Sequence, residues 1–284
     1  MGHLISPEQL HELIASGSPG LRILDVRWRL DRPNGRPEHL AGHLPGAVYV
    51  DLDTELAEHG RPAAEGRHPL PALETLQTAA RRWGLNDGDT VVVYDDMKNT
   101  SSARAWWLLR HAGLRDVRVL DGSLRGWARA GYPLETGDVV PEPGTVTLQY
   151  GALGHVDIDD AASFPHRGTL LDVRIPERYR GEVEPMDPRP GHIPGALNAP
   201  TAENVDQDGR FLLPEALRER FLALGVDPQK PVASYCGSGI NGCHSVLALE
   251  LAGFEAVLYP GSFSEWSNNY DRPVATGNTS GQAP

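Results

Sequence analysis

The chain of 284 residues contains only two cysteines, Cys236 and Cys243. Two thiols cannot form a disulfide framework or a four-cysteine zinc site. Cys236, Cys243 and His244 also supply too few ligands at useful spacing for another metal site, so we expect no bound metal, and we expect no cofactor. No apolar run approaches the roughly 20 residues that a membrane-spanning helix needs. The first ten residues also lack the basic and apolar regions of a secretory signal. These absences predict a cytoplasmic protein in a reducing compartment.

Basic residues are fewer than acidic residues: the chain has 26 lysines and arginines against 38 aspartates and glutamates, and its net charge is −12. Such a charge disfavours binding to phosphate backbones, so nucleic acid is not an expected partner. An acidic protein that handles an anionic substrate must instead concentrate its few arginines at the site. The 40% hydrophobic fraction is that of an ordinary globular protein.

The chain contains one internal repeat. The recurring blocks pair residues 24–27 with 171–174, 42–47 with 191–196, 93–95 with 234–236, and 121–127 with 260–266. Four blocks, each repeated once in the same order, indicate a duplicated domain rather than a solenoid. A stretch rich in proline and glycine at 136–144 is the expected linker. We therefore predict one domain over residues 1–140 and a second over residues 141–284.

Each half alternates buried strands with helices that end at glycines. The expected strands are 21–27, 47–51, 90–95, 117–120 and 231–235, and the expected helices are 71–83, 102–112, 214–224 and 243–252. This alternation predicts an α/β fold in which each domain is a mostly parallel sheet flanked by helices.

A glycine-rich turn places Cys236 between the strand 231–235 and the helix that follows. Backbone N–H groups in such a turn, next to a helix N-terminus, favour anions such as a thiolate. The matching position in the first half is Asp95, which has neither the thiol nor the glycines. The alternative is that Cys236 is a small core residue, but a core thiol needs no cradle of glycines. The second half is thus predicted to be catalytic and the first half inactive.

The repeated blocks and the cysteine loop together resemble the two-domain rhodanese-like sulfurtransferases over nearly the whole chain. Within that family, the loop 236–241 is similar to the Cys-Gly-Ser-Gly-Val-Thr loop of 3-mercaptopyruvate sulfurtransferases. Members that prefer thiosulfate usually carry basic residues after the cysteine, where this chain has Gly237 and Ser238. Ile240 and Asn241 depart from the mercaptopyruvate pattern.

The resemblance implies transfer of sulfane sulfur from 3-mercaptopyruvate to a thiol or to cyanide through a persulfide on Cys236. Thioredoxin is a candidate thiol acceptor. Two alternatives stay open: thiosulfate as the donor, and a sulfur-carrier or redox-sensing module that does not turn over. A phosphatase is excluded, because the arginine that would grip phosphate six positions after the cysteine is replaced by Gly242.

The resemblance also implies site residues. Besides Cys236, Ser238 is expected to hydrogen-bond the substrate or relay its proton, although its hydroxyl could instead cap the next helix. Gly237, Gly239, Ile240 and Asn241 form the rest of the expected cradle.

Arg178 matches the family's arginine for the substrate carboxylate, and arginine suits that task because its guanidinium is a bidentate donor. Met186 stands where the second such arginine is expected, so Arg189 is the nearest substitute. Arg174 is more plausible as a structural partner of Asp172.

His43 matches a family histidine that reaches the substrate cleft. It is repeated as His192 in the other half, which favours a structural role instead.

Overall fold

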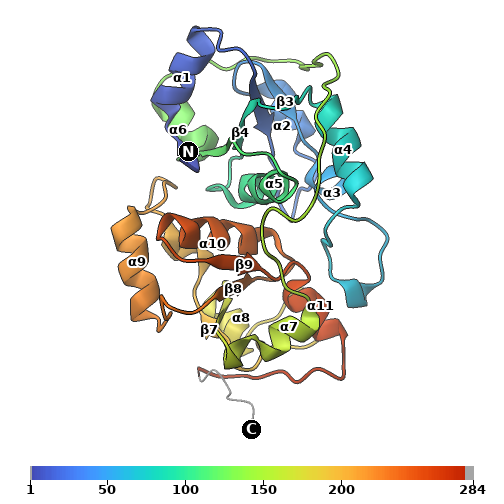
Figure 1. The fold of residues 1–284 in the computed structure, drawn as a ribbon, viewed down its shortest axis with the longest axis vertical. Helices are drawn as coiled ribbons and strands as arrows, with labels where there is room; N and C mark the ends of the chain where they lie inside the picture. Colours follow the sequence, from blue (N-terminus) through green and yellow to red (C-terminus); the bar gives the residue numbers. More distant parts are fainter. Residues whose placement is uncertain (1, 279–284) are drawn as a thin grey trace. The chain divides into compact units, whose positions relative to one another are not determined.

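The computed structural model describes residues 2–278. By contacts the chain divides into two compact units, each traced in Figure 1. The first unit comprises Met1–Glu58, Leu70–Leu153 and Val205–Phe211; the second comprises His59–Pro69, Gly154–Asn204 and Leu212–Pro284. A short segment from each half of the sequence thus belongs to the other half's unit. The domain boundary near residue 140 stays a prediction, because compact units need not coincide with duplicated sequence.

The first unit is built on a five-stranded sheet in which every pairing is parallel. The strand order is β1-β5-β4-β2-β3. The strands are β1 (Leu4–Ile5), β2 (Leu21–Asp25), β3 (Ala47–Tyr49), β4 (Thr90–Tyr94) and β5 (Val117–Leu120). Its α-helices are α1 (Pro7–Ala15), α2 (Arg36–Ala41), α3 (Leu52–Glu55), α4 (Leu73–Arg82), α5 (Thr100–His111) and α6 (Ser123–Arg129).

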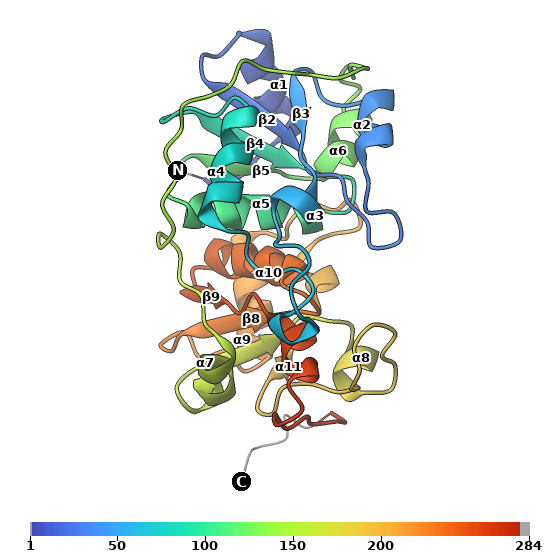
Figure 2. The same ribbon diagram turned by 90° about the vertical axis from the view of Figure 1, so that its right-hand side faces the viewer.

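Helices cover the two faces of this sheet. Leu10 of α1 and Trp127 of α6 are buried in one core cluster with Ile23 and Val92 of the strands. Helix α5 packs on β4 and β5 from the other side, as the side view in Figure 2 shows. Burial of apolar side chains on both faces explains why these strands are near-continuous apolar runs.

The second unit repeats the plan with a four-stranded parallel sheet of order β7-β6-β8-β9. The strands are β6 (Thr169–Asp172), β7 (Leu197–Asn198), β8 (Val232–Tyr235) and β9 (Ala256–Leu258). The α-helices are α7 (Ile158–Ser163), α8 (Pro176–Arg180), α9 (Pro214–Ala223), α10 (Ile240–Leu251) and α11 (Ser262–Asn268). Three short 3₁₀ helices are η1 (Ala63–Glu65), η2 (Phe164–His166) and η3 (Thr201–Asn204). Helices α7 and α11 share one core with the sheet, and α10 packs against β8 and β9.

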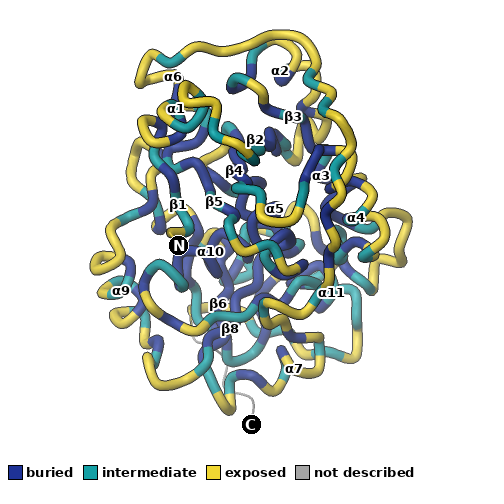
Figure 3. Tube along the Cα trace, turned by 45° about the horizontal axis from the view of Figure 1, so that its top comes forward, coloured by how far each residue is buried: buried dark blue, intermediate teal, exposed yellow. Residues whose placement is uncertain are grey.

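The predicted α/β fold with parallel sheets is confirmed, and the central strands of both sheets are buried in Figure 3. The start of α10 differs from the prediction: it lies at Ile240 rather than at Cys243. Gly242 disfavoured a helix in the sequence, yet a Cβ on it would lie 2.9 Å from Cδ1 of Leu258 in β9. Close packing of α10 on the sheet therefore requires a glycine inside the helix.

Within residues 2–278, no helix is both long enough and apolar enough to cross a membrane.

Candidate active site

Cys236 lies in the turn between β8 and α10, and only 4% of its surface is exposed. Its Sγ accepts hydrogen bonds from the backbone N–H of Ser238 at 3.4 Å and of Gly239 at 3.1 Å. Gly239 precedes the helix with a left-handed backbone, at φ +83°. The sulfur therefore sits at the N-terminus of a 12-residue helix, where a negative charge is stabilised by roughly 0.3 to 1 kcal/mol from the dipole alone.

The start of α11 holds this turn from the other side. The Cys236 N–H donates to Oγ of Ser262 at 3.1 Å. The carbonyl oxygens of Cys236 and Gly237 accept from the N–H groups of Phe263 at 3.0 Å and Ser264 at 2.8 Å. The turn is thus fixed by backbone hydrogen bonds on both sides, and its donors stay aimed at the sulfur.

Arg178 of α8 lies beside the turn, and its binding of a substrate carboxylate stays a prediction. Its Nη2 contacts Oε1 of Glu184 at 2.6 Å and Oδ2 of Asp187 at 3.0 Å. A Cβ built on Gly237 would lie 3.5 Å from its Nη1. Two buried carboxylates therefore orient the guanidinium while one edge of it faces Gly237.

Sequence reasoning missed Arg67, which also lies at the turn. Its Nη2 would be 3.1 Å from a Cβ on Gly237, and its Nη1 pairs with Oδ1 of Asp187. Arg67 comes from the segment His59–Pro69, which the sequence repeat assigns to the first half but which packs in the second unit. No repeated block contains it, so the only signal was the general expectation that arginines gather at the site.

The other predicted loop residues surround the thiol. Ser238 is half-buried and Ile240 is buried. The N-cap of α10 is Gly239, which has no side-chain capping bond, so the alternative that Ser238 caps this helix is not supported. Asn241 lies half-buried in the first turn of α10.

Arg189 is not brought to this turn. Its guanidinium donates to backbone carbonyl oxygens at 2.7 to 2.8 Å, which belong to Trp266, Ser267, Asn269 and Arg272. Because these carbonyls occupy its donors, the geometry supports a role in holding the end of α11 rather than the predicted contact with substrate. Met186 is 41% exposed and offers no charge in its place.

Arg174 forms the structural pair that was predicted. Its Nη2 contacts Oδ2 of Asp172 at 2.6 Å and donates to the carbonyl oxygen of Gly191 at 2.6 Å. Burial alone would favour the neutral guanidine, but the Asp172 carboxylate outweighs it and raises the pKa of Arg174.

His43 has no exposed surface and lies in the first unit. Its ring stacks on His39 with centroids 4.0 Å apart, and its Nδ1 is 2.8 Å from the His39 carbonyl oxygen. In the second unit His192 stacks on Tyr179 in the same way, at 3.7 Å. This repeated, fully buried arrangement favours the structural alternative over the predicted contact with substrate.

Cys243 is fully buried, and its thiol donates to the carbonyl oxygen of Gly239 at 3.2 Å. It therefore supports the start of α10 from within the helix.

The matching turn in the first unit forms the same cradle but fills it with its own carboxylate. Asp95 is fully buried and accepts from the N–H groups of Met97, Asn99, Ser101 and Ser102 at 2.8 to 3.0 Å. Burial raises the pKa of Asp95, and these N–H donors act against that effect. No glycine is needed, because Lys98 and Asn99 adopt left-handed backbones at φ +59° and +66°.

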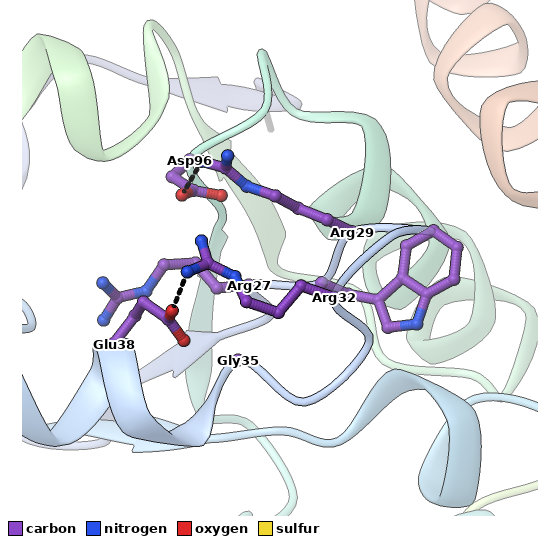
Figure 4. Close-up of a pocket in the computed structure, with 7 residues that line it drawn as sticks. Arg27, Arg29, Arg32, Gly35, Glu38 and Asp96 are labelled. Atoms are coloured by element: carbon purple, nitrogen blue, oxygen red, sulfur yellow. Dashed lines mark hydrogen bonds and ion pairs between the residues drawn. The ribbon is translucent and has the colours of Figure 1, made fainter.

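The next residue along this turn is Asp96, and its carboxylate pairs with an arginine. Its Oδ2 lies 2.5 Å from Nη2 of Arg29. Figure 4 shows this pair at a small pocket of the first unit, next to the pair of Arg32 and Glu38. In the repeat, Asp96 occupies the position of Gly237. The first unit therefore carries carboxylates at both positions where the second unit has a thiol and a glycine.

Comparisons with known proteins agree with this architecture. A family model described as "Rhodanese-like domain" matches residues 6–130 and 157–269. A Mycobacterium tuberculosis protein with the provisional name thiosulfate sulfurtransferase SseB is 46% identical, with 96% of this chain and 97% of that protein aligned. A Pseudomonas aeruginosa protein with the provisional name 3-mercaptopyruvate sulfurtransferase is 43% identical, over 96% of this chain and 98% of that protein.

The crystal structure of SseA from Escherichia coli, described as a 3-mercaptopyruvate sulfotransferase with the rhodanese fold, matches with a TM-score of 0.82. That match has 34% identity and covers 92% of this chain and 99% of SseA. Two matched domains, a cysteine cradle in the second and relatives aligned along nearly their full length place this chain in a family: it belongs to the two-domain rhodanese-like sulfurtransferases.

Proposed function

We propose that the chain is a sulfurtransferase that takes sulfane sulfur from 3-mercaptopyruvate and holds it as a persulfide on Cys236. The observation that carries this proposal is the turn around Cys236, where two N–H donors point at the sulfur and arginine donors face the adjacent Gly237. The first feature stabilises a thiolate or persulfide anion, and the second suits a carboxylate on the donor.

In the first half of the reaction, the Cys236 thiolate attacks the sulfur of 3-mercaptopyruvate. The new S–S bond forms as the carbon–sulfur bond breaks, and its electron pair stays on carbon as the enolate of pyruvate. A proton then converts the enolate to pyruvate. In the second half, an acceptor thiolate or cyanide attacks the outer sulfur, and Cys236 leaves as a thiolate. This is a double displacement with a covalent intermediate.

Ser238 is proposed to hydrogen-bond the donor or to relay its proton. Its backbone N–H contacts Sγ of Cys236 at 3.4 Å and the residue is half-buried, which supports this role. Gly239, Ile240 and Asn241 complete the cradle in this proposal.

Thiosulfate is the second candidate donor, because the relative that is 46% identical is named for it. The turn favours the mercapto acid, since the two positions after Cys236 are Gly237 and Ser238, neither of which carries a charge. The thiosulfate dianion would gain most from basic side chains at these positions.

The acceptor is proposed to be a small thiol, cyanide or a protein dithiol such as thioredoxin. A dithiol would release the sulfur as sulfide while it becomes a disulfide, so the electrons balance. The chain has only two cysteines, which supports a reducing, cytoplasmic setting.

Steady-state rates with 3-mercaptopyruvate and with thiosulfate test the proposal, together with mass spectrometry of the protein after exposure to each donor. We expect the larger kcat/KM with 3-mercaptopyruvate and a gain of one sulfur on the Cys236 peptide. Cys236→Ser should abolish both, whereas Cys243→Ser should retain the persulfide. A larger kcat/KM with thiosulfate would overturn the choice of donor, and full activity of Cys236→Ser would overturn the mechanism.

A further inference from the structure

The segment His59–Pro69 is held on the second unit by contacts at the start of α11. The N–H of Arg67 donates to Oγ of Ser264 at 3.1 Å, and Nδ2 of Asn269 donates to the Ala64 carbonyl oxygen at 3.0 Å. Gly66 has φ +89°, and a Cβ on it would lie 3.0 Å from the Gly261 carbonyl oxygen. Only glycine fits this conformation and approach, so the position of Arg67 is built into the packing.

Asp187 joins Arg67 to Arg178. Its side chain has no exposed surface, and its two oxygens are divided between the two guanidinium groups. Arg67 uses Nη1 for this pairing, while Arg178 uses Nη2 for Asp187 and Nε and Nη2 for Glu184. The nitrogens closest to Gly237 are the other ones, Nη2 of Arg67 and Nη1 of Arg178. Each guanidinium group therefore directs toward Gly237 a nitrogen that takes no part in these ion pairs.

The matching position in the first unit shows which chemical group binds to an arginine there. At the position that matches Gly237, the Asp96 side chain places a carboxylate 2.5 Å from an arginine nitrogen. Gly237 has no side chain, so this position supplies no carboxylate of its own to the nitrogens of Arg67 and Arg178 nearest to it. Two guanidinium groups around one carboxylate give charge-assisted hydrogen bonds that one arginine alone cannot supply.

We propose that Arg67 and Arg178 together bind the carboxylate of the sulfur donor above Gly237, so that Arg67 is a specificity-determining residue of the second unit. This inference rests on the proposed function, because it assumes a carboxylate-bearing donor. It also assigns the second carboxylate-binding arginine to the segment His59–Pro69 rather than to the region of Met186 and Arg189.

The test compares two donors in wild type and in Arg67→Gln. 3-Mercaptopyruvate carries the carboxylate, whereas mercaptoacetone keeps the thiol and ketone and has a methyl group in its place. For Arg67→Gln we expect kcat/KM with 3-mercaptopyruvate to fall about 10- to 100-fold, chiefly through KM, since a charged hydrogen bond is lost. The value with mercaptoacetone should not change. Arg67→Lys should lie between the two, because it keeps the charge but not the fork.

Arg61→Gln is the matched control, since Arg61 lies on the same segment and pairs with Glu65 at 2.6 Å with half of its side chain exposed. It should leave both donors unaffected. Equal losses with both donors in Arg67→Gln and Arg67→Lys, or no loss with either, would overturn the inference. Failure of the proposed function is seen separately, as the absence of a Cys236 persulfide in wild type treated with 3-mercaptopyruvate.

Discussion

At the scale of single residues, two adjacent positions distinguish the turn of the second unit, which we predict to be catalytic, from the matching turn of the first unit. Asp95 fills its backbone cradle and Asp96 pairs with Arg29, so the first unit satisfies its own anion-binding groups. Cys236 and Gly237 stand at the same two positions in the second unit. A thiol there can bind sulfur, and a missing side chain leaves arginine donors available.

This comparison predicts that the side chain introduced by Gly237→Asp lowers activity by occupying the arginines that would bind the donor. The new carboxylate would meet Arg67 and Arg178, as Asp96 meets Arg29, and would compete with the donor. We expect kcat/KM for 3-mercaptopyruvate to fall at least about 10-fold more than in Gly237→Asn, which has the same size without the charge. Steady-state kinetics of the two variants measure this difference. Equal losses would mean that bulk, not charge, blocks the site.

At the scale of elements, the start of α10 depends on a left-handed residue before the helix. Gly239 provides it at φ +83°, and Asn99 provides it before α5 in the first unit at φ +66°. Asparagine tolerates this conformation better than other residues with a side chain. The two turns thus reach one backbone shape with different sequences.

Gly239→Asn should therefore be tolerated better than Gly239→Ala. Alanine at a left-handed position costs about 1 to 2 kcal/mol of the free energy of unfolding, and we expect asparagine to cost less. Urea denaturation measures both. Gly42→Ala is the control, because Gly42 has an extended backbone and a Cβ on it would make an ordinary contact with Leu134 at 3.4 Å. A loss in Gly42→Ala as large as in Gly239→Ala would show that backbone strain is not the cause.

At the scale of the whole molecule, stability should depend on pH through a histidine far from the cysteine turn in sequence. Burial, followed by the charge of Arg110, lowers the pKa of His3 to about 4. Its Nδ1 lies 2.7 Å from Nη1 of Arg110. Between the ordinary histidine pKa of 6.5 and about 4, the unfolded chain therefore binds a proton that the folded chain does not. The contribution of His3 to stability is present above this window and is lost as the pH falls through it.

His3→Gln should weaken this dependence. We expect the urea midpoint of wild type to fall more than that of His3→Gln between about pH 7 and about pH 5. The same substitution at the exposed His59 controls for the loss of a histidine. Parallel pH profiles for wild type and His3→Gln would contradict the assignment.

Much of the fold could be read from local patterns, because strand and helix periodicity and glycine caps act over a few residues. The repeat also located the cysteine turn, since the contrast between Cys236 and Asp95 is visible in the aligned blocks. The contacts of Arg189 could not be predicted from local patterns. It is close in sequence to the expected arginine, but its direction depends on carbonyls of α11 that lie about 80 residues away along the chain.

The sequence by itself determined the duplicated α/β plan and predicted the catalytic half and the nucleophile, because each depends on residue types in a local order. The tertiary structure alone decided which arginines stand at the cysteine turn. Arg67 reaches it only because the segment His59–Pro69 packs in the second unit, through a left-handed Gly66 and hydrogen bonds to α11. Such contacts join residues nearly 200 positions apart in sequence, and no local pattern encodes them.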